Sequence, residues 1–116
     1  MVDAASDDGP VADAEPVVSC ECQGGTVSVY EDRVLIERSS RSMFEDKTIP
    51  MMEISGVEYT GGIVSGHLQI QQSGFDHDDG GFLTHPVDAN TLYFPRAKRE
   101  CARRARDEIL SRALGE

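Results

Sequence analysis

The sequence predicts an α+β fold, mainly β, in which antiparallel strands are capped by one C-terminal helix. Two observations lead to this class. Short segments with alternating apolar side chains fill residues 26–94, and one amphipathic segment that opens on a proline fills residues 95–114. A series of hairpins leaves one end of the sheets uncovered, and a helix with one apolar stripe can close that end. We therefore expect a two-sheet sandwich or bent barrel with a helical cap.

The first hairpin has the clearest pattern. Residues 26–30 and 33–38 each alternate between apolar and polar side chains, and the polar pair Glu31-Asp32 separates them. Alternation of this kind indicates strands with one buried face. The predicted buried positions in this hairpin are Val27, Val29, Val34 and Ile36.

Further strands follow along the chain. Gly56 is expected to mark a bulge in one of them. In another, residues 67–71, the side chains of Leu68 and Ile70 are expected to face the core, while His67 and the glutamines face solvent. With the first hairpin the total is seven strands, and the further ones are expected at 47–50, 54–60, 67–71, 82–87 and 91–94.

The helix is predicted over residues 95–114. Pro95 suits its first position, where the missing N–H has no partner in any case, and Gly115 suits its end. An apolar side chain recurs every four residues and forms one buried stripe, made of Cys101, Ala105, Ile109 and Ala113.

The N-terminal segment differs from the rest in composition. Residues 1–16 carry five acidic side chains and no basic one, and no strand or helix period is present. We expect a disordered acidic tail over residues 1–18 and one domain over residues 19–116. The tail lacks the apolar centre of a signal peptide, and no apolar run is long enough to span a membrane. A cytoplasmic protein without membrane insertion is therefore expected.

The charge balance is strongly acidic. The chain holds 21 acidic and 11 basic residues, for a formal net charge of −10, and its only lysines are Lys47 and Lys98. Such a composition is typical of a protein kept soluble in concentrated salt, where screening weakens self-repulsion. We expect a halophilic protein. An ordinary acidic cytosolic protein, or one with a cationic partner, is the alternative.

Three segments resemble the prokaryotic pleckstrin-homology-like (PH-like) domains, of the halophilic archaeal type. They read Asp-Arg-Val-Leu-Ile-Glu at 32–37, Lys-Thr-Ile-Pro with Ile-Ser-Gly-Val at 47–57, and Gly-His-Leu-Gln-Ile at 66–70. The resemblance covers residues 24–113. It implies a seven-strand bent barrel with one end closed by the C-terminal helix. It also implies a binding or assembly role with no catalytic residues.

Phosphoinositide binding is not expected. Eukaryotic relatives that hold phosphoinositides use clustered basic side chains on the first hairpin to contact the phosphates. Here that hairpin turns through Tyr30-Glu31-Asp32-Arg33, with two acids against one base.

Two clusters have metal-binding chemistry but the wrong spacing. Asp76-His77-Asp78-Asp79 lacks the ligand pattern of an EF-hand, and we expect a solvated acidic loop. Cys20 and Cys22 lack the second ligand pair that structural zinc needs. With Cys101 they are expected to be reduced thiols, as in most cytosolic proteins. No metal or cofactor is predicted.

Catalysis is not expected either. His67 and His85 could serve as bases, but no Ser or Cys stands in a nucleophile motif near either residue. No phosphate-binding glycine loop is present, because Gly61-Gly62 and Gly80-Gly81 have the pattern of turns.

The leading functional hypothesis is a PH-like module that binds a protein partner or a second copy of itself through open strand edges. The alternative is a nucleic-acid accessory protein that uses the basic helix, although the net negative charge opposes this partner. The candidate partner-binding residues are Arg99, Arg103 and Arg104. The helical segment holds seven of the eleven basic residues, namely Arg96, Lys98, Arg99, Arg103, Arg104, Arg106 and Arg112.

Overall fold

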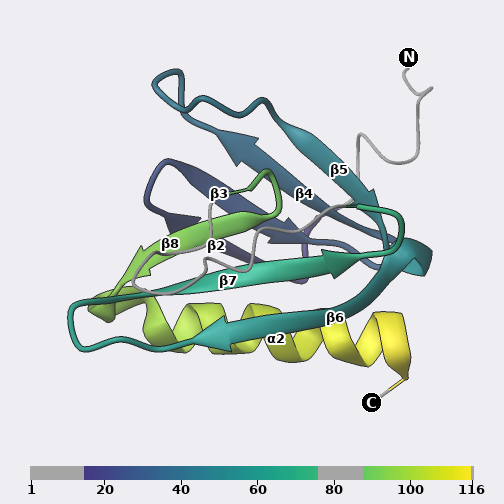
Figure 1. Cartoon of the computed structure of the whole chain (residues 1–116). Helices are drawn as coiled ribbons and strands as arrows, with labels where there is room; N and C mark the ends of the chain where they lie inside the picture. Colours follow the sequence, from purple (N-terminus) through teal and green to yellow (C-terminus); the bar gives the residue numbers. More distant parts are fainter. Residues whose placement is uncertain (1–14, 76–87, 116) are drawn as a thin grey trace.

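Two antiparallel sheets and one helix build the fold in the computed structural model, which describes residues 15–75 and 88–115 (Figure 1). The four-stranded sheet consists of β2 (Val18–Cys22), β3 (Gly25–Val29), β4 (Arg33–Arg38) and β5 (Lys47–Pro50). The three-stranded sheet consists of β6 (Ile54–Thr60), β7 (Ser65–Gln72) and β8 (Thr91–Pro95). The remaining elements are the 3-10 turns η1 (Met51–Glu53) and η2 (Arg96–Lys98) and the helix α2 (Arg99–Leu114).

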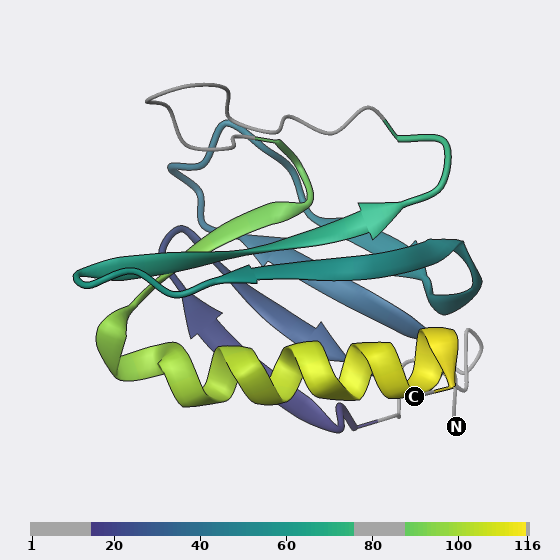
Figure 2. The same ribbon diagram turned by 60° about the horizontal axis from the view of Figure 1, so that its bottom comes forward.

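Each sheet is a meander in chain order, and α2 covers one side of the assembly. The helix packs mainly against β6 and β2, and it runs alongside β6 in both ribbon views (Figures 1 and 2). The two sheets meet at one corner, where the Gln23 N–H donates to the Tyr93 carbonyl oxygen at 2.7 Å. The α+β class is therefore confirmed, with seven described strands, and neither sheet closes on itself.

The core has the composition that the alternating segments predicted. In β3 and β4 the predicted apolar positions are all at most 1% exposed, and the Val27↔Ile36 and Val29↔Val34 pairs lie across the hairpin. The predicted bulge is confirmed by a register shift between Ile54 and Gly56. From α2 the fully buried side chains are Ala102, Ala105 and Ile109, and Cys101 and Ala113 are partly buried beside them.

One strand was missed, and one predicted strand lies outside the described residues. β2 begins at Val18, one residue before the predicted domain start, and Val18 and Cys20 face the core. The Val17 N–H donates to the Val29 carbonyl oxygen at 2.7 Å, which extends the pairing of β2 with β3. The segment predicted as a strand at 82–87 falls in the part of the chain that the structure does not describe.

The prediction that His67 lies on a solvent-facing surface is wrong. His67 is 8% exposed and its ring packs against Tyr93, with 5.3 Å between ring centroids. Gln69 is also buried, and its side-chain amide donates to Asp88 and Thr91. β7 is the central strand of its sheet, and Tyr93 of β8 and Asp88 cover the face that alternation assigned to water.

The helix begins later than predicted. Pro95 has an extended backbone (φ −74°, ψ 165°) and ends β8, while η2 separates it from the start of α2 at Arg99. The predicted C-terminal end of the helix is confirmed. Gly115 adopts the left-handed conformation (φ 74°), and its N–H donates to the Ser111 carbonyl oxygen.

The prediction of three reduced thiols is wrong. Cys20 of β2 and Cys101 of α2 form a disulfide, with their Cα atoms 5.9 Å apart, and Cys22 is the free cysteine among the described residues. The bond forms because both side chains lie where the helix packs on β2, a contact between residues 81 positions apart. Within the described chain, α2 is too short and too polar to cross a membrane.

Candidate functional site

A hollow of about 580 Å³ lies where the loop between β6 and β7 meets the start of the helix. We call it the arginine hollow. Both ribbon views place this loop and the start of α2 at the same end of the molecule (Figures 1 and 2). Its lining residues are Tyr59, Gly61, Gly62, Ile63, Arg96, Arg99 and Arg103.

Glycines give the β6–β7 loop its close turn. A Cβ added at Gly62 would lie 2.0 Å from the Ser65 carbonyl oxygen, and one added at Gly66 would lie 2.2 Å from the Thr60 carbonyl oxygen. Both distances are far inside van der Waals contact, so a side chain at either position would displace the backbone. The tip of the hairpin can take this shape only with glycine at these places.

Two hydrogen bonds fasten the hairpin tip to the segment that begins the helix. The Arg96 N–H donates to the Val64 carbonyl oxygen at 3.2 Å. The Arg99 guanidinium donates to the Gly62 carbonyl oxygen. These bonds hold the hairpin tip against the start of the helix, and they hold the Arg99 guanidinium in place.

Three arginines of the hollow have no carboxylate partner among the described residues. Arg96, Arg99 and Arg103 form no ion pair there, whereas Arg112 has two glutamate partners and Arg106 has Asp107. Arg96 and Arg103 are exposed and Arg99 is half-buried. Three uncompensated positive charges at one hollow make a local site for an anion in a chain whose net charge is negative.

Two polar groups at the same hollow are buried without a hydrogen-bond partner in the described part of the chain. They are the Nε of Arg99 and the hydroxyl of Tyr59. A buried donor left unsatisfied costs about 1–3 kcal/mol, so such groups favour a bound acceptor. The Arg106 guanidinium packs on the Tyr59 ring, 5.2 Å from the ring centre.

The hairpin tip itself is apolar and exposed. Ile63 is 84% exposed and Val64 is 80% exposed, directly beside the three arginines. Loop tips that face water are usually polar, because Gly, Asn, Asp and Ser satisfy their turns. Two adjacent aliphatic side chains are therefore unusual at this position.

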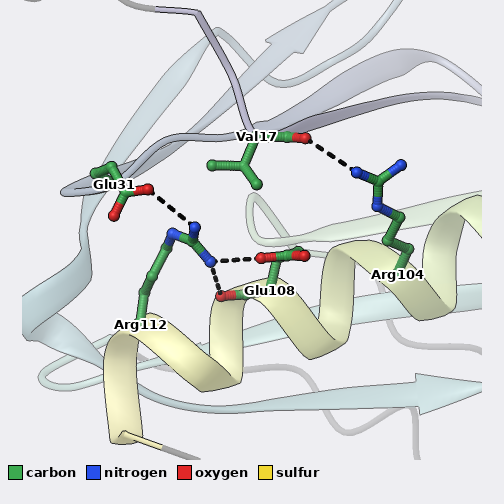
Figure 3. A network of polar contacts seen from close by, with 5 residues as sticks. All are labelled: Val17, Glu31, Arg104, Glu108 and Arg112. Atoms are coloured by element: carbon green, nitrogen blue, oxygen red, sulfur yellow. Dashed lines mark hydrogen bonds and ion pairs between the residues drawn. The ribbon is translucent and has the colours of Figure 1, made fainter.

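The three predicted partner-binding residues separate in the structure. Arg99 and Arg103 lie together at the hollow, but Arg104 points to the other side of the helix, where its guanidinium donates to the Val17 carbonyl oxygen at 3.5 Å (Figure 3). Sequence reasoning missed the roles of Arg96, Tyr59 and the hairpin tip. The apolar pair Ile63-Val64 in a glycine turn was the signal that could have found the tip.

The far end of the basic helix has a structural role. Arg112 donates to Glu31 at 2.9 Å and to Glu108 at 2.5 Å, which connects the last turns of α2 to the β3–β4 loop (Figure 3). The hydrogen bond that Arg112 donates to Glu31, more than any other contact, raises the pKa of Arg112 above its usual value. This end of the helix therefore has no free positive charge to offer a ligand.

A second hollow, of about 310 Å³, lies beside the β4–β5 loop and includes Arg38 and Met43. Arg38 donates to the carbonyl oxygens of Ala89 at 2.8 Å and Thr91 at 3.2 Å. Burial lowers the pKa of Arg38 below its usual value. These bonds hold the start of β8 in place, so we assign Arg38 a structural role.

The residues considered for metal binding do not form a site within the described chain. No group of three or more His, Cys, Asp or Glu side chains gathers there at metal-binding distance. The predicted cation candidates Asp76-His77-Asp78-Asp79, like His85, lie outside the described residues. Cys20 cannot be a zinc thiolate because its sulfur is bonded to Cys101.

No protein-family model matches the sequence, and comparison with curated proteins and with solved structures returns no match either. The function therefore has to be argued from the geometry of the arginine hollow and of the sheets.

Proposed function

We propose that this chain is a non-catalytic binding module of the PH-like type, which holds a phosphate-bearing partner at the arginine hollow. The observation that carries the proposal is the grouping of three guanidinium groups without carboxylate partners around two buried, unsatisfied donors. Guanidinium groups bind phosphate oxygens through paired, charge-assisted hydrogen bonds.

The order of elements supports the PH-like assignment. A four-stranded meander, a three-stranded meander and one C-terminal helix follow one another along the chain. This is the order that the resemblance of segments 32–37, 47–57 and 66–70 implies. The helix packs on β6 and β2, one strand from each sheet, as a cap would.

The strand edges support partner binding less well than the hollow does. β6 lies along α2, while β2 and β8 meet at the Gln23–Tyr93 bridge, so β5 is the outer strand with the freest edge in the described chain. The Met51 N–H donates to the Asp32 carbonyl oxygen. Antiparallel pairs alternate, so Thr48 and Pro50 direct their backbone groups outward.

Pro50 has no N–H, so this four-residue edge offers a single outward donor, that of Thr48. Natural sheets block edge pairing by this means. Strand addition would form few hydrogen bonds here, and for this reason we place the binding surface at the hollow.

The cellular compartment and the adaptation to salt are also part of the proposal. We propose a cytoplasmic, salt-adapted protein on the basis of the acidic composition. The disulfide between Cys20 and Cys101 would then be unusual, since cytosolic thiols are mostly kept reduced. Alkylation of the thiols during cell lysis, followed by mass spectrometry, would determine the state of these two cysteines in the cell.

Titration with inorganic pyrophosphate, followed by amide NMR, tests the hollow directly. We expect saturable shifts at residues 61–64 and 96–103. Arg99→Gln with Arg103→Gln should weaken binding at least about tenfold, because each lost charged hydrogen bond is worth more than 1 kcal/mol. The charge-matched control is Arg104→Gln with Arg41→Gln, which removes two exposed arginines outside the hollow.

Equal loss of affinity in both double variants would mean that only the net charge matters, and the hollow would not be the site. The absence of any saturable shift, in low or in concentrated salt, would overturn the proposed function.

A further inference from the structure

We infer that the arginine hollow and the hairpin tip together bind the surface of an anionic phospholipid membrane, an inference that rests on the proposed function and names its partner. In this arrangement Ile63 and Val64 enter the interfacial layer of the lipid. Arg96, Arg99 and Arg103 contact the lipid phosphates behind them. The sequence predicted no membrane insertion. In this inference no helix enters the bilayer, and only the side chains of Ile63 and Val64 reach its interfacial layer.

The exposure of the tip is the first step of the argument. Ile63 and Val64 are neighbours in a loop of four residues and are 84% and 80% exposed. The glycines that close the loop give the two side chains no cover. The hairpin projects past the sheets at the end where the helix starts (Figures 1 and 2). A projecting aliphatic pair gains free energy by leaving water, and lipid is a surface that it can enter without a shaped pocket.

The position of the charges is the second step. The Arg96 N–H donates to the carbonyl oxygen of Val64, and Arg99 donates to that of Gly62. The backbone of Arg96 and the guanidinium of Arg99 are therefore held beside the apolar tip, and Arg103 lines the same hollow. This is the order of groups that a membrane interface offers, with acyl chains below a layer of phosphates.

The chemistry of the tip favours lipid over nucleic acid, which shares the phosphate group. Proteins that bind single strands stack bases on aromatic side chains, and Ile63 and Val64 are aliphatic. Tyr59 is the ring nearest to the hollow, and Arg106 and Phe94 cover its two sides, with ring centroids of Tyr59 and Phe94 5.6 Å apart. No base could stack there.

The overall charge sets the orientation. With a net charge of −10 the protein is repelled by an anionic surface in most orientations. Glu100, Asp107 and Glu108 line a neighbouring hollow along the helix, which shares Arg103 with the arginine hollow. Binding is therefore expected only with the hairpin tip toward the lipid, and a site-specific probe can detect it.

Vesicle co-sedimentation tests the inference. We expect the full chain to sediment with vesicles of equal parts phosphatidylcholine and phosphatidylglycerol, and to stay in solution with phosphatidylcholine alone. Ile63→Ser with Val64→Ser should weaken vesicle binding at least about tenfold. The two aliphatic side chains gain this free energy of binding when they leave water for the lipid. The same variant should keep pyrophosphate affinity within about twofold, since it removes no donor.

The matched control changes two exposed apolar residues elsewhere. Met43→Ser with Met52→Ser should leave vesicle binding unchanged, although these side chains are 81% and 90% exposed. Both double variants alter surface positions, and circular dichroism would verify that each is folded.

A fluorescent probe reports the position of the tip. The chain has no tryptophan, so Ile63→Trp introduces a single one. Its emission should shift to shorter wavelength with anionic vesicles and be quenched by lipids brominated on the acyl chains. Met52→Trp should show neither change.

Each contrary result has a defined meaning. Pyrophosphate shifts without vesicle binding would overturn the membrane inference and leave the proposed function intact. Vesicle binding that ignores the Ile63 and Val64 substitutions would overturn insertion of the tip. A duplex or single-stranded oligonucleotide that displaces the vesicles and binds the serine variant equally well would assign the surface to nucleic acid.

Discussion

The Arg99 guanidinium donates a hydrogen bond to the carbonyl oxygen of Gly62, which lies 37 positions earlier in the chain. This bond connects the first turn of α2 to the turn of the β6–β7 hairpin. It also leaves the Nε of Arg99 buried without a partner in the described chain. One side chain at the hollow therefore holds the loop in place and also has an unused donor.

The shape of this loop depends on Gly62. We predict that Gly62→Ala lowers the free energy of unfolding by about 1–3 kcal/mol, because its Cβ would clash with the Ser65 carbonyl oxygen. The same change should displace the loop and weaken pyrophosphate binding. Gly56→Ala is the control, since its Cβ would lie 3.8 Å from the nearest neighbouring atom, on the Gln71 side chain. Chemical denaturation measures both variants, and a Gly62→Ala protein as stable as Gly56→Ala would contradict the prediction.

Ile109 is the largest fully buried side chain of the helix. It is fully buried between α2 and the sheets. Ile109→Asp should cost at least about 3 kcal/mol, because the new carboxylate would be buried without a partner. For a domain of this size that loss is expected to abolish cooperative unfolding in thermal melts. Leu114→Asp, at a position 44% exposed, should cost far less. A soluble Ile109→Asp protein with a normal melt would mean that α2 is not a structural cap.

The disulfide should contribute measurably to stability. Cys20 and Cys101 close a loop of 81 positions, and a link of this length is expected to be worth about 2–4 kcal/mol. We predict that reductant, or Cys101→Ser, lowers the melting temperature. In denaturant without reductant, a thiol assay should find one reactive cysteine per chain, rising to three after reduction. Three thiols before reduction would show that the bond does not form.

Cys22 should be a poor nucleophile at neutral pH. Burial raises the pKa of its thiol from 9.0 to about 11, although Lys98 and Arg38 act in the opposite direction. The rate of alkylation of the folded protein should therefore rise only well above pH 9. In denaturant, the rate of alkylation of Cys22 should already rise as the pH approaches the ordinary pKa of a thiol.

The same pKa difference links Cys22 to stability. The unfolded chain releases the thiol proton at a lower pH than the folded chain, so this contribution is fully present below pH 9 and is lost as the pH rises toward 11. The loss should reach about 3 kcal/mol at most. Cys22→Ala should remove this dependence, so its unfolding free energy should fall less between these pH values. Parallel curves for the two proteins would contradict the assigned pKa.

Local patterns predicted the strands whose neighbours are close in sequence. Val27, Val29, Val34 and Ile36 alternate within one hairpin, and a short loop decides which face they share. The pattern failed at His67, because its burial depends on Tyr93 of β8. No period along β7 contains that information.

The disulfide and the site were hidden for a related reason. The spacing of Cys20 and Cys101 says nothing about the 5.9 Å between their Cα atoms, which results from the packing of α2 on β2. The sequence singled out Arg99 and Arg103 as basic helix residues. It could not separate them from Arg104, which differs in direction, or bring Tyr59 and Gly62 to the same hollow.

The bond between Cys20 and Cys101 makes most of this chain a covalent ring, with both termini outside it. A protease that cuts any single peptide bond within the ring leaves the two fragments attached to one another. Such a nicked protein would migrate as one species on a gel without reductant and as two bands after reduction. Within the ring, a broken backbone therefore need not separate the molecule into two pieces.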